Sequence, residues 1–228
     1  MREAIILAGG LGTRLRSALP DLPKCMAPVN DKPFLAYVIN YLQSEGITHF
    51  IFSLGYKSEA ITAFLQKKFP SLSYKIIVEE EPLGTGGAVK KALAAAKDNN
   101  VLIVNGDTLF KADLKLLSSA DTLSEACCTL SLKPMKNFSR YGVVEMDEFG
   151  IIKKFKEKQF YQSGLINGGV YALNKNKFLS ENLPDKFSFE TDYLEKFYKI
   201  RRMAGIVQDE YFIDIGIPED YARAQREL

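Results

Sequence analysis

The chain begins with a short apolar segment that stops at two glycines, and this pattern restricts the fold more than any other feature of the sequence. Residues Ala4–Ala8 carry only apolar side chains, and Gly9 and Gly10 follow them directly. A short apolar run ended by glycine is typical of a strand that is buried on both faces of a parallel sheet. We therefore expect a buried parallel strand at the start of the chain.

Strand-like and helix-like segments then alternate through the first half of the chain. Short apolar stretches predict strands, and apolar stripes at helical spacing predict helices. The expected strands are 49–54, 74–78 and 101–104, and the expected helices are 34–45, 58–69 (with Ser58 as its N-cap) and 86–97. This alternation predicts an α/β fold with a Rossmann-like, doubly wound sheet that is mixed but mainly parallel.

Strand-like segments dominate the second half. The expected strands are 126–132, 142–146 and 169–173, and the helix candidates are 189–197 and 218–227. No internal repeat and no linker rich in Pro, Gly or Ser divides the sequence. We therefore expect a single domain over residues 1–228.

Composition and charge argue against several classes of partner. The net charge is +2 with no basic stripe, which argues against a nucleic-acid partner. No apolar run approaches the ~20 residues that span a bilayer, so no membrane association is expected. The three cysteines are odd in number and two are adjacent, which makes a poor disulfide framework. A reducing compartment suits them, and we expect a cytoplasmic protein.

The segment Leu7–Leu15 (LAGGLGTRL) is the first candidate for chemistry. It follows the expected strand at its carboxyl end, where open α/β sheets bind ligands. Glycines allow successive backbone N–H groups to face an anion, and Arg14 adds a permanent forked charge suited to phosphate. The alternative is a tight turn with an incidental arginine. Two other phosphate-binding patterns fail, because Leu15 replaces the third glycine of the dinucleotide motif and no GxxxxGK[ST] occurs.

A second candidate segment is LPKCMAPV, which places Lys24 between Pro23 and Pro28. Prolines on both sides prevent a continuous helix, so Lys24 is held in a defined position from which it could reach the same phosphates. Taken alone, the segment could equally be a loop with a solvated lysine.

The two segments together resemble the signature of the sugar nucleotidylyltransferase family, GGxGTRL followed by PKxxxPV. The resemblance continues through EEPLGTGGA, NGD, RYGVVE, FKEK, INGGVY and FIDIGIPEDY. It implies a fold of the nucleotide-diphospho-sugar transferase type and transfer of a nucleotidyl group from a nucleoside triphosphate to a sugar 1-phosphate. It also implies a nucleotide-binding half at about 1–110, a sugar-phosphate-binding half at about 111–228, and a homo-oligomer, either a dimer or a tetramer.

Among family members, the chain most resembles the short enzymes that make GDP-activated heptose from D-glycero-α-D-manno-heptose 1-phosphate. Arg14, Lys24 and Asp107 match the family's catalytic positions. The residues that the resemblance assigns to the nucleotide are Leu7, Gly9, Gly10, Gly12, Thr13, Arg14, Lys24, Glu79, Glu80, Gly84, Thr85 and Asp107.

The identity of the base is suggested by the segment Glu79–Gly87 (EEEPLGTGG), which the family uses to hold it. Guanine presents adjacent N–H donors on its pairing edge, and one carboxylate can accept both. Uracil and thymine suit an amide better. Three glutamates and no glutamine therefore favour GTP, with Glu79 or Glu80 as the reader and Gly84 allowing close backbone approach. The alternative is a solvated acidic turn.

Two aspartates suggest a Mg²⁺ site. Asp107 follows an expected strand, and Asp214 lies in the apolar run FIDIG. Mg²⁺ prefers oxygen ligands and usually takes only one or two carboxylates from protein. The family places its metal at these two positions. For either residue alone, a cap or a turn is the simpler interpretation.

The resemblance assigns the sugar phosphate to the second half, at Gly142, Glu157, Lys158, Asn167 and Glu190. Gly168 stands where relatives have alanine, and we expect it to loosen the loop and make room for a larger sugar. Cys25 lies beside Lys24, whose charge could lower its pKa and make it sensitive to thiol reagents, but we expect an incidental small hydrophobic residue there.

Three alternatives remain open at this stage. One is another enzyme of the same chemistry, using mannose 1-phosphate with GTP or glucose 1-phosphate with UTP or dTTP. A second is a non-catalytic sugar-nucleotide sensor. A third is a glycosyltransferase, although Asn105-Gly106-Asp107 is not its usual Asp-x-Asp metal motif.

Overall fold

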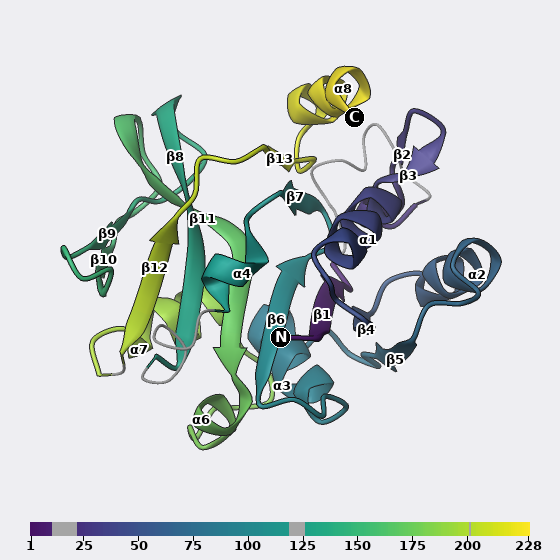
Figure 1. Ribbon diagram of the computed structural model, residues 1–228, viewed down its shortest axis with the longest axis horizontal. Helices are drawn as coiled ribbons and strands as arrows, with labels where there is room; N and C mark the ends of the chain where they lie inside the picture. The colour runs from purple at the N-terminus through teal and green to yellow at the C-terminus, as the bar shows by residue number, and fades with distance from the viewer. Residues whose placement is uncertain (11–21, 119–125, 201) are drawn as a thin grey trace.

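A seven-stranded sheet forms the centre of the protein in the computed structural model, which describes residues 1–10, 22–118, 126–200 and 202–228 (Figure 1). The strand order is β12-β8-β11-β6-β1-β4-β5. The strands are β1 (Glu3–Ala8), β4 (His49–Leu54), β5 (Tyr74–Val78), β6 (Asn100–Asn105), β8 (Cys128–Phe138), β11 (Tyr161–Asn174) and β12 (Met203–Val207). Only β11 runs antiparallel to its neighbours within this sheet, which confirms the predicted mixed, mainly parallel α/β fold.

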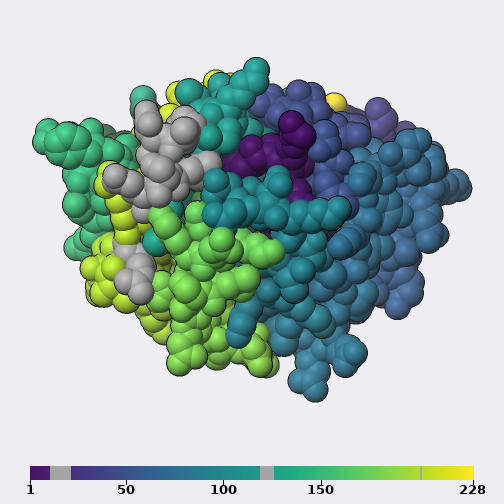
Figure 2. All heavy atoms as spheres, turned by 60° about the horizontal axis from the view of Figure 1, so that its bottom comes forward, coloured from purple at the N-terminus to yellow at the C-terminus, as the bar shows by residue number. Residues whose placement is uncertain are grey.

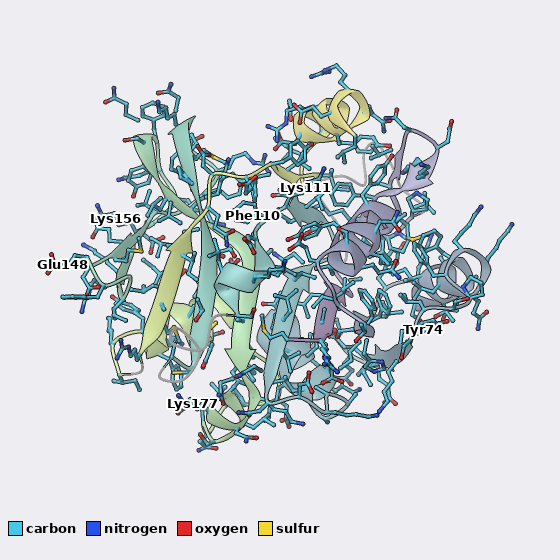
Figure 3. All side chains as sticks on the ribbon, in the orientation of Figure 1. Tyr74, Phe110, Lys111, Glu148, Lys156 and Lys177 are labelled. Carbon is cyan, nitrogen blue, oxygen red and sulfur yellow. The ribbon has the colours of Figure 1, made fainter. Side chains whose placement is uncertain are left out.

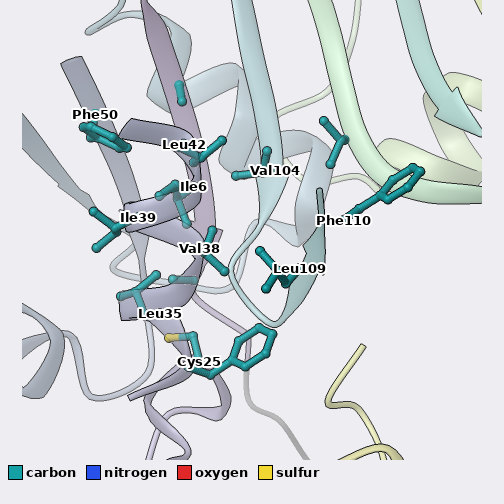
Figure 4. Close-up of a cluster of buried hydrophobic side chains, with 14 of the residues drawn as sticks. Ile6, Cys25, Leu35, Val38, Ile39, Leu42, Phe50, Val104, Leu109 and Phe110 are labelled. Atoms are coloured by element: carbon teal, nitrogen blue, oxygen red, sulfur yellow. The ribbon is translucent and has the colours of Figure 1, made fainter. Parts of the chain in front are cut away.

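Helices cover both faces of the sheet, as a doubly wound fold requires. The described helices are α1 (Phe34–Ser44), α2 (Ser58–Lys68), α3 (Gly84–Leu93), α4 (Leu114–Leu117), α6 (Lys175–Leu179), α7 (Glu195–Phe197) and α8 (Pro218–Glu227), with a 3-10 turn η1 (Lys24–Met26) and a π-helix η2 (Phe189–Leu194). Side chains alternate between the faces of a strand. Ile6 of β1 therefore packs in the core under α1, α2 and α4 (Figure 4), whereas Ile5 packs in the core under α3, α6 and η2.

The helix boundaries differ in places from the expected ones. The α8 range matches its prediction, but the segment expected as one helix over 189–197 is the π-helix η2 followed by the short α7. Helix α3 begins earlier than expected. It also ends earlier, because the chain tightens into i→i+3 hydrogen bonds at Ala94–Ala96. Ser58 is the first residue of α2 and not its N-cap, a position taken by Lys57 in a left-handed conformation.

Three small two-stranded sheets flank the large one. They pair β2 (Pro28–Val29) with β3 (Lys32–Pro33), β9 (Val144–Met146) with β10 (Ile152–Phe155), and β7 (Thr108–Phe110) with β13 (Phe212–Asp214). Figure 3 shows Lys156 and Glu148 at the β9–β10 hairpin and Phe110 near the middle of the molecule.

Segments from the two halves of the sequence pack side by side. Figure 2 shows the first half in blue on one side and the second half in green to yellow on the other. The contact runs through the large sheet, because β11 pairs with β6 through five residues, from Val170↔Val104 to Asn174↔Asn100. Among the described helices, none is long and apolar enough to cross a membrane.

Candidate active site

A cleft of about 1160 Å³ lies at the carboxyl ends of β1, β4, β5 and β6. Gly12, Thr13 and Arg14 lie outside the described residues. Every other residue assigned from the sequence lines the cleft: Leu7, Gly9, Gly10, Lys24, Glu79, Glu80, Gly84, Thr85, Asp107, Gly142, Glu157, Lys158, Asn167, Glu190 and Asp214. The sequence-based assignments therefore converge on one concave surface, at the place where α/β sheets bind ligands.

The two aspartates meet because the small β7–β13 sheet brings their strands together. Asp214 is the last residue of β13 and pairs with Thr108, the residue after Asp107. The backbone N–H of Ile215 also donates to the carbonyl of Asp107 at 3.1 Å. Lys24 reaches between the carboxylates, with Nζ at 2.5 Å from Asp107 Oδ2 and 3.4 Å from Asp214 Oδ1.

This cluster fits a Mg²⁺ ion that is shared with phosphate groups. Two carboxylates converge on one point, and the Lys24 ammonium lies between them, where positive charge is most stabilised. Among the described residues, no set of three or more His, Cys, Asp and Glu side chains forms a metal cage. Mg²⁺ usually takes only one or two carboxylates and fills its remaining positions with water and substrate phosphates.

Asp214 is held by further donors that the sequence analysis did not assign. Its Oδ1 accepts from Gly216 N at 2.8 Å, and its Oδ2 accepts from Arg140 Nη2 and from the hydroxyl of Tyr141, each at 3.3 Å. Arg140 also pairs with Asp220 on α8. The RYG motif contained the signal for Arg140 and Tyr141, but only its glycine had been given a role.

The segment Glu79–Thr85, here called the base loop, is fixed partly by its own first residue. Glu79 Oε2 accepts from the backbone N–H of Leu83 at 3.0 Å, and Oε1 lies 3.4 Å from the Ser53 hydroxyl. Glu80, by contrast, is exposed at the wall of the cleft. The two glutamates therefore differ in their availability to a ligand.

The base loop also docks on the second half of the chain. Phe187 N donates to the carbonyl of Leu83 at 3.0 Å, and Gly86 N donates to the carbonyl of Phe187 at 3.0 Å. Gly84 has φ +71°, and a Cβ there would lie 2.5 Å from the Phe187 oxygen. The hydroxyl of Thr85 accepts from Phe189 N at 2.9 Å, one residue before Glu190.

Polar side chains of the second half form the opposite wall. Asn167 donates to the Tyr171 hydroxyl at 2.9 Å, and that hydroxyl lies 3.5 Å from Glu190 Oε1. Glu195 also lines the cleft and was not assigned from the sequence. Partial burial raises its pKa, and the neighbouring charges of Glu157 and Glu190 raise it further. This wall is therefore rich in hydrogen-bond acceptors.

Two glycines on this wall allow close packing within the protein. A Cβ on Gly142 would lie 2.3 Å from the carbonyl oxygen of Lys156, so this glycine lets two backbone segments approach. A Cβ on Gly168 would lie 2.3 Å from Cδ1 of Phe110 and 3.0 Å from the carbonyl oxygen of Ser131. The expectation that Gly168 loosens a loop was therefore wrong, because Gly168 lies within β11 and the space beside it is occupied by the buried Phe110 ring. The expectation that it makes room for a larger sugar stays a prediction.

Cys25 is a small buried side chain, as expected, but Lys24 does not lower its pKa overall. The thiol is buried among Leu35, Val38 and Leu109 (Figure 4). Burial raises the pKa of Cys25 to about 12, and the charge of Asp107 acts in the same direction. The opposing effect of Lys24 on this pKa is smaller. All three cysteines are buried thiols that form no disulfide.

The comparison with protein families decides the class of this protein. The model for the nucleotidyl transferase family matches residues 3–228. The chain belongs to this family. It is 50% identical over 226 residues to a D-glycero-α-D-manno-heptose 1-phosphate guanylyltransferase of Aneurinibacillus thermoaerophilus, covering 99% of this chain and 98% of the relative.

Two further similarities extend over the whole chain. A D-glycero-α-D-manno-heptose 1-phosphate guanylyltransferase of Campylobacter jejuni is 47% identical, with 96% of each chain covered. The crystal structure of HddC from Yersinia pseudotuberculosis complexed with GMP-PN superposes with a TM-score of 0.89 at 38% identity, covering 100% of this chain and 99% of that chain. The family and the fold expected from the sequence are thereby confirmed.

Proposed function

We propose that this protein transfers the GMP moiety of GTP to D-glycero-α-D-manno-heptose 1-phosphate, forming a GDP-heptose and releasing pyrophosphate. The observation that carries the proposal is the single cleft onto which the Lys24–Asp107–Asp214 cluster, the base loop and the acceptor-rich wall all face. The relatives at 50% and 47% identity, both named for this activity and matched over nearly their whole length, support the choice of substrates.

The proposed reaction is an in-line displacement at phosphorus. A phosphate oxygen of the sugar 1-phosphate attacks the α-phosphorus of GTP, and the bond from that phosphorus to the leaving pyrophosphate breaks. The attacking oxygen is already anionic, so no side-chain nucleophile or base is needed. The protein must instead align two polyanions and offset their repulsion.

The charged residues divide this task between them. Lys24 would neutralise charge near the α-phosphate, and Lys158, on the opposite wall, would anchor the attacking phosphate. The backbone of Gly9 and Gly10, together with Arg14, would hold the triphosphate and the leaving pyrophosphate. A Mg²⁺ ion held by Asp107 and Asp214 would supply charge neutralisation at the phosphate oxygens.

The base would be read by Glu80 rather than Glu79. The Glu79 carboxylate is already used by Leu83 N within the base loop, whereas Glu80 is exposed at the cleft wall. A carboxylate in this position can accept both N–H groups of the guanine pairing edge. Glu80→Gln should therefore shift preference from GTP toward UTP or dTTP.

The proposal is tested by a panel of GTP, UTP, dTTP and ATP against heptose, mannose and glucose 1-phosphates, scored by pyrophosphate release. We expect the fastest turnover with GTP and the heptose. Glu79→Gln is the matched comparison for the base, and it should weaken the base loop while leaving the order of nucleotides unchanged. A wild-type preference for mannose 1-phosphate, or for UTP or dTTP with glucose 1-phosphate, would replace the proposed substrates with those alternatives.

A further inference from the structure

Asp220 lies on the first turn of α8 and is connected to the candidate metal site by two arginines. Arg140 pairs with Asp220 through Nη1, and its Nη2 donates to Asp214 Oδ2 at 3.3 Å. Arg223 Nη1 lies 3.3 Å from Asp220 Oδ1, and Arg223 Nη2 donates to the carbonyl of Phe212 at 2.9 Å. One carboxylate therefore holds both the side chain of Asp214 and the backbone of the strand that carries it.

We infer that Asp220 is a positioning residue for the metal ligand Asp214, an inference that rests on the proposed function. Among the described residues, Arg140 and Tyr141 donate to Asp214 Oδ2. The guanidinium of Arg140 can hold Asp214 Oδ2 in one place because its other nitrogen, Nη1, pairs with Asp220. Partners of this kind orient metal ligands in many sites.

Asp220 also balances charge at the site. Arg140 is a permanent cation within 3.3 Å of a carboxylate that is proposed to bind another cation. Asp220 shares that cation, and its side chain is only 18% exposed, so screening by water is limited. Without the Asp220 charge, Arg140 would pair fully with Asp214 and compete with the metal. Asp220 should therefore favour metal binding in two ways, by fixing the position of Arg140 and by weakening the pairing of Arg140 with Asp214.

Direct titration with Mn²⁺, followed by electron paramagnetic resonance on the nucleotide-free protein, tests the inference without relying on turnover. Asp220→Asn keeps the shape of the side chain and removes its charge, and we expect Mn²⁺ affinity to fall about tenfold. The Mg²⁺ concentration for half-maximal activity should rise by a similar factor, while KM for GTP at saturating Mg²⁺ stays at the wild-type value.

Glu219→Gln is the matched control, because it removes the same charge from the same turn of α8 at an exposed position. It should leave Mn²⁺ affinity unchanged. Arg140→Lys keeps the charge but cannot bridge both carboxylates, so its Mn²⁺ affinity should fall as much as that of Asp220→Asn. This second variant tests the inference even if Asp220→Asn does not fold.

Wild-type Mn²⁺ affinity in Arg140→Lys, or in a folded Asp220→Asn protein, would overturn the inference and leave the proposed function intact. An equal loss in Glu219→Gln would also overturn it, since the effect would then come from the net charge of the helix. Failure of the wild-type protein to bind Mn²⁺ with or without GTP would overturn the metal assignment of the proposed function together with this inference.

Discussion

Replacing Gly168 with alanine should damage both the stability and the activity of the protein, because the added methyl group would overlap the ring of Phe110. The Cβ would lie 2.3 Å from Cδ1 and 2.5 Å from Cε1 of that ring. Phe110 is 1% exposed and makes an edge-to-face contact with Phe212 at 5.7 Å, so the ring has no empty space to enter. Either strand β11, which carries Gly168, or strand β7 must shift.

The magnitude follows from the packing and from the position of β7. Overpacking a well-filled core costs about 1–3 kcal/mol, which in a chain of this size lowers Tm by roughly 2–12 °C. Phe110 of β7 pairs with Phe212 of β13; Asp107 directly precedes β7, and Asp214 is the last residue of β13. A shift of the strands by about 1 Å at the reacting groups can reduce kcat on the order of 10²-fold.

Thermal denaturation and pyrophosphate release with heptose and mannose 1-phosphates measure the two effects. The double variant Gly168→Ala/Phe110→Leu should recover part of both losses, because the smaller side chain removes the overlap. The sequence-based interpretation of Gly168 makes the opposite prediction, an unchanged Tm with preference shifted toward a smaller sugar. That result would refute the packing argument.

Other residues of the cluster give further expectations. Asp107→Asn should lower kcat on the order of 10²–10³-fold through lost charge stabilisation, with a Tm near wild type; near-normal turnover in Mg²⁺ would remove the metal assignment. Lys24→Ala leaves two carboxylates facing each other, so its turnover should fall and Mg²⁺ should raise its Tm, relative to EDTA, more than it raises that of wild type. Intact turnover with only a lower Tm would assign Lys24 a structural role.

The pKa of the Cys25 thiol is about 12 in the folded protein, compared with an ordinary value of 9.0. The contribution of this thiol to the free energy of unfolding is therefore fully present below pH 9 and decreases as the pH rises toward 12. No thiol of the native protein should therefore react rapidly with a disulfide reagent at pH 8, although all three should react in denaturant; one fast native thiol would contradict the burial argument.

Local patterns in the sequence were sufficient for the parallel strands β1, β4, β5 and β6, but they did not predict β12, which pairs in parallel with β8. The apolar runs of β1, β4 and β5 end at Gly9, Gly55 and Glu79, and these ends define the cleft. Strand β11 was predicted only in part, because its first half is polar and carries no strand pattern. Its antiparallel position between β8 and β6 is decided by long-range pairing, which local periodicity does not encode.

The candidate site could likewise be predicted from the sequence only in part. Glycines and charged residues that follow strands could be found from the sequence, since strand ends meet at one edge of a parallel sheet. The pairing of Arg140 with Asp220 could not, because it depends on helix α8 packing beside β13. Gly168 was misjudged for a related reason, since the residue that fills the space beside it, Phe110, is distant in the sequence.

The docking of the base loop on Phe187 has a consequence for protein engineering. Chimeras that exchange residues 111–228 of this protein for those of a relative would replace one side of the hydrogen bonds that join Leu83 and Gly86 to Phe187. Phe187 fills the space beside Gly84 and Gly86, so a segment of different shape taken from a relative would not fit there. A working exchange of sugar specificity must therefore transplant the loop and its partner segment as one unit, even though they come from opposite halves of the chain.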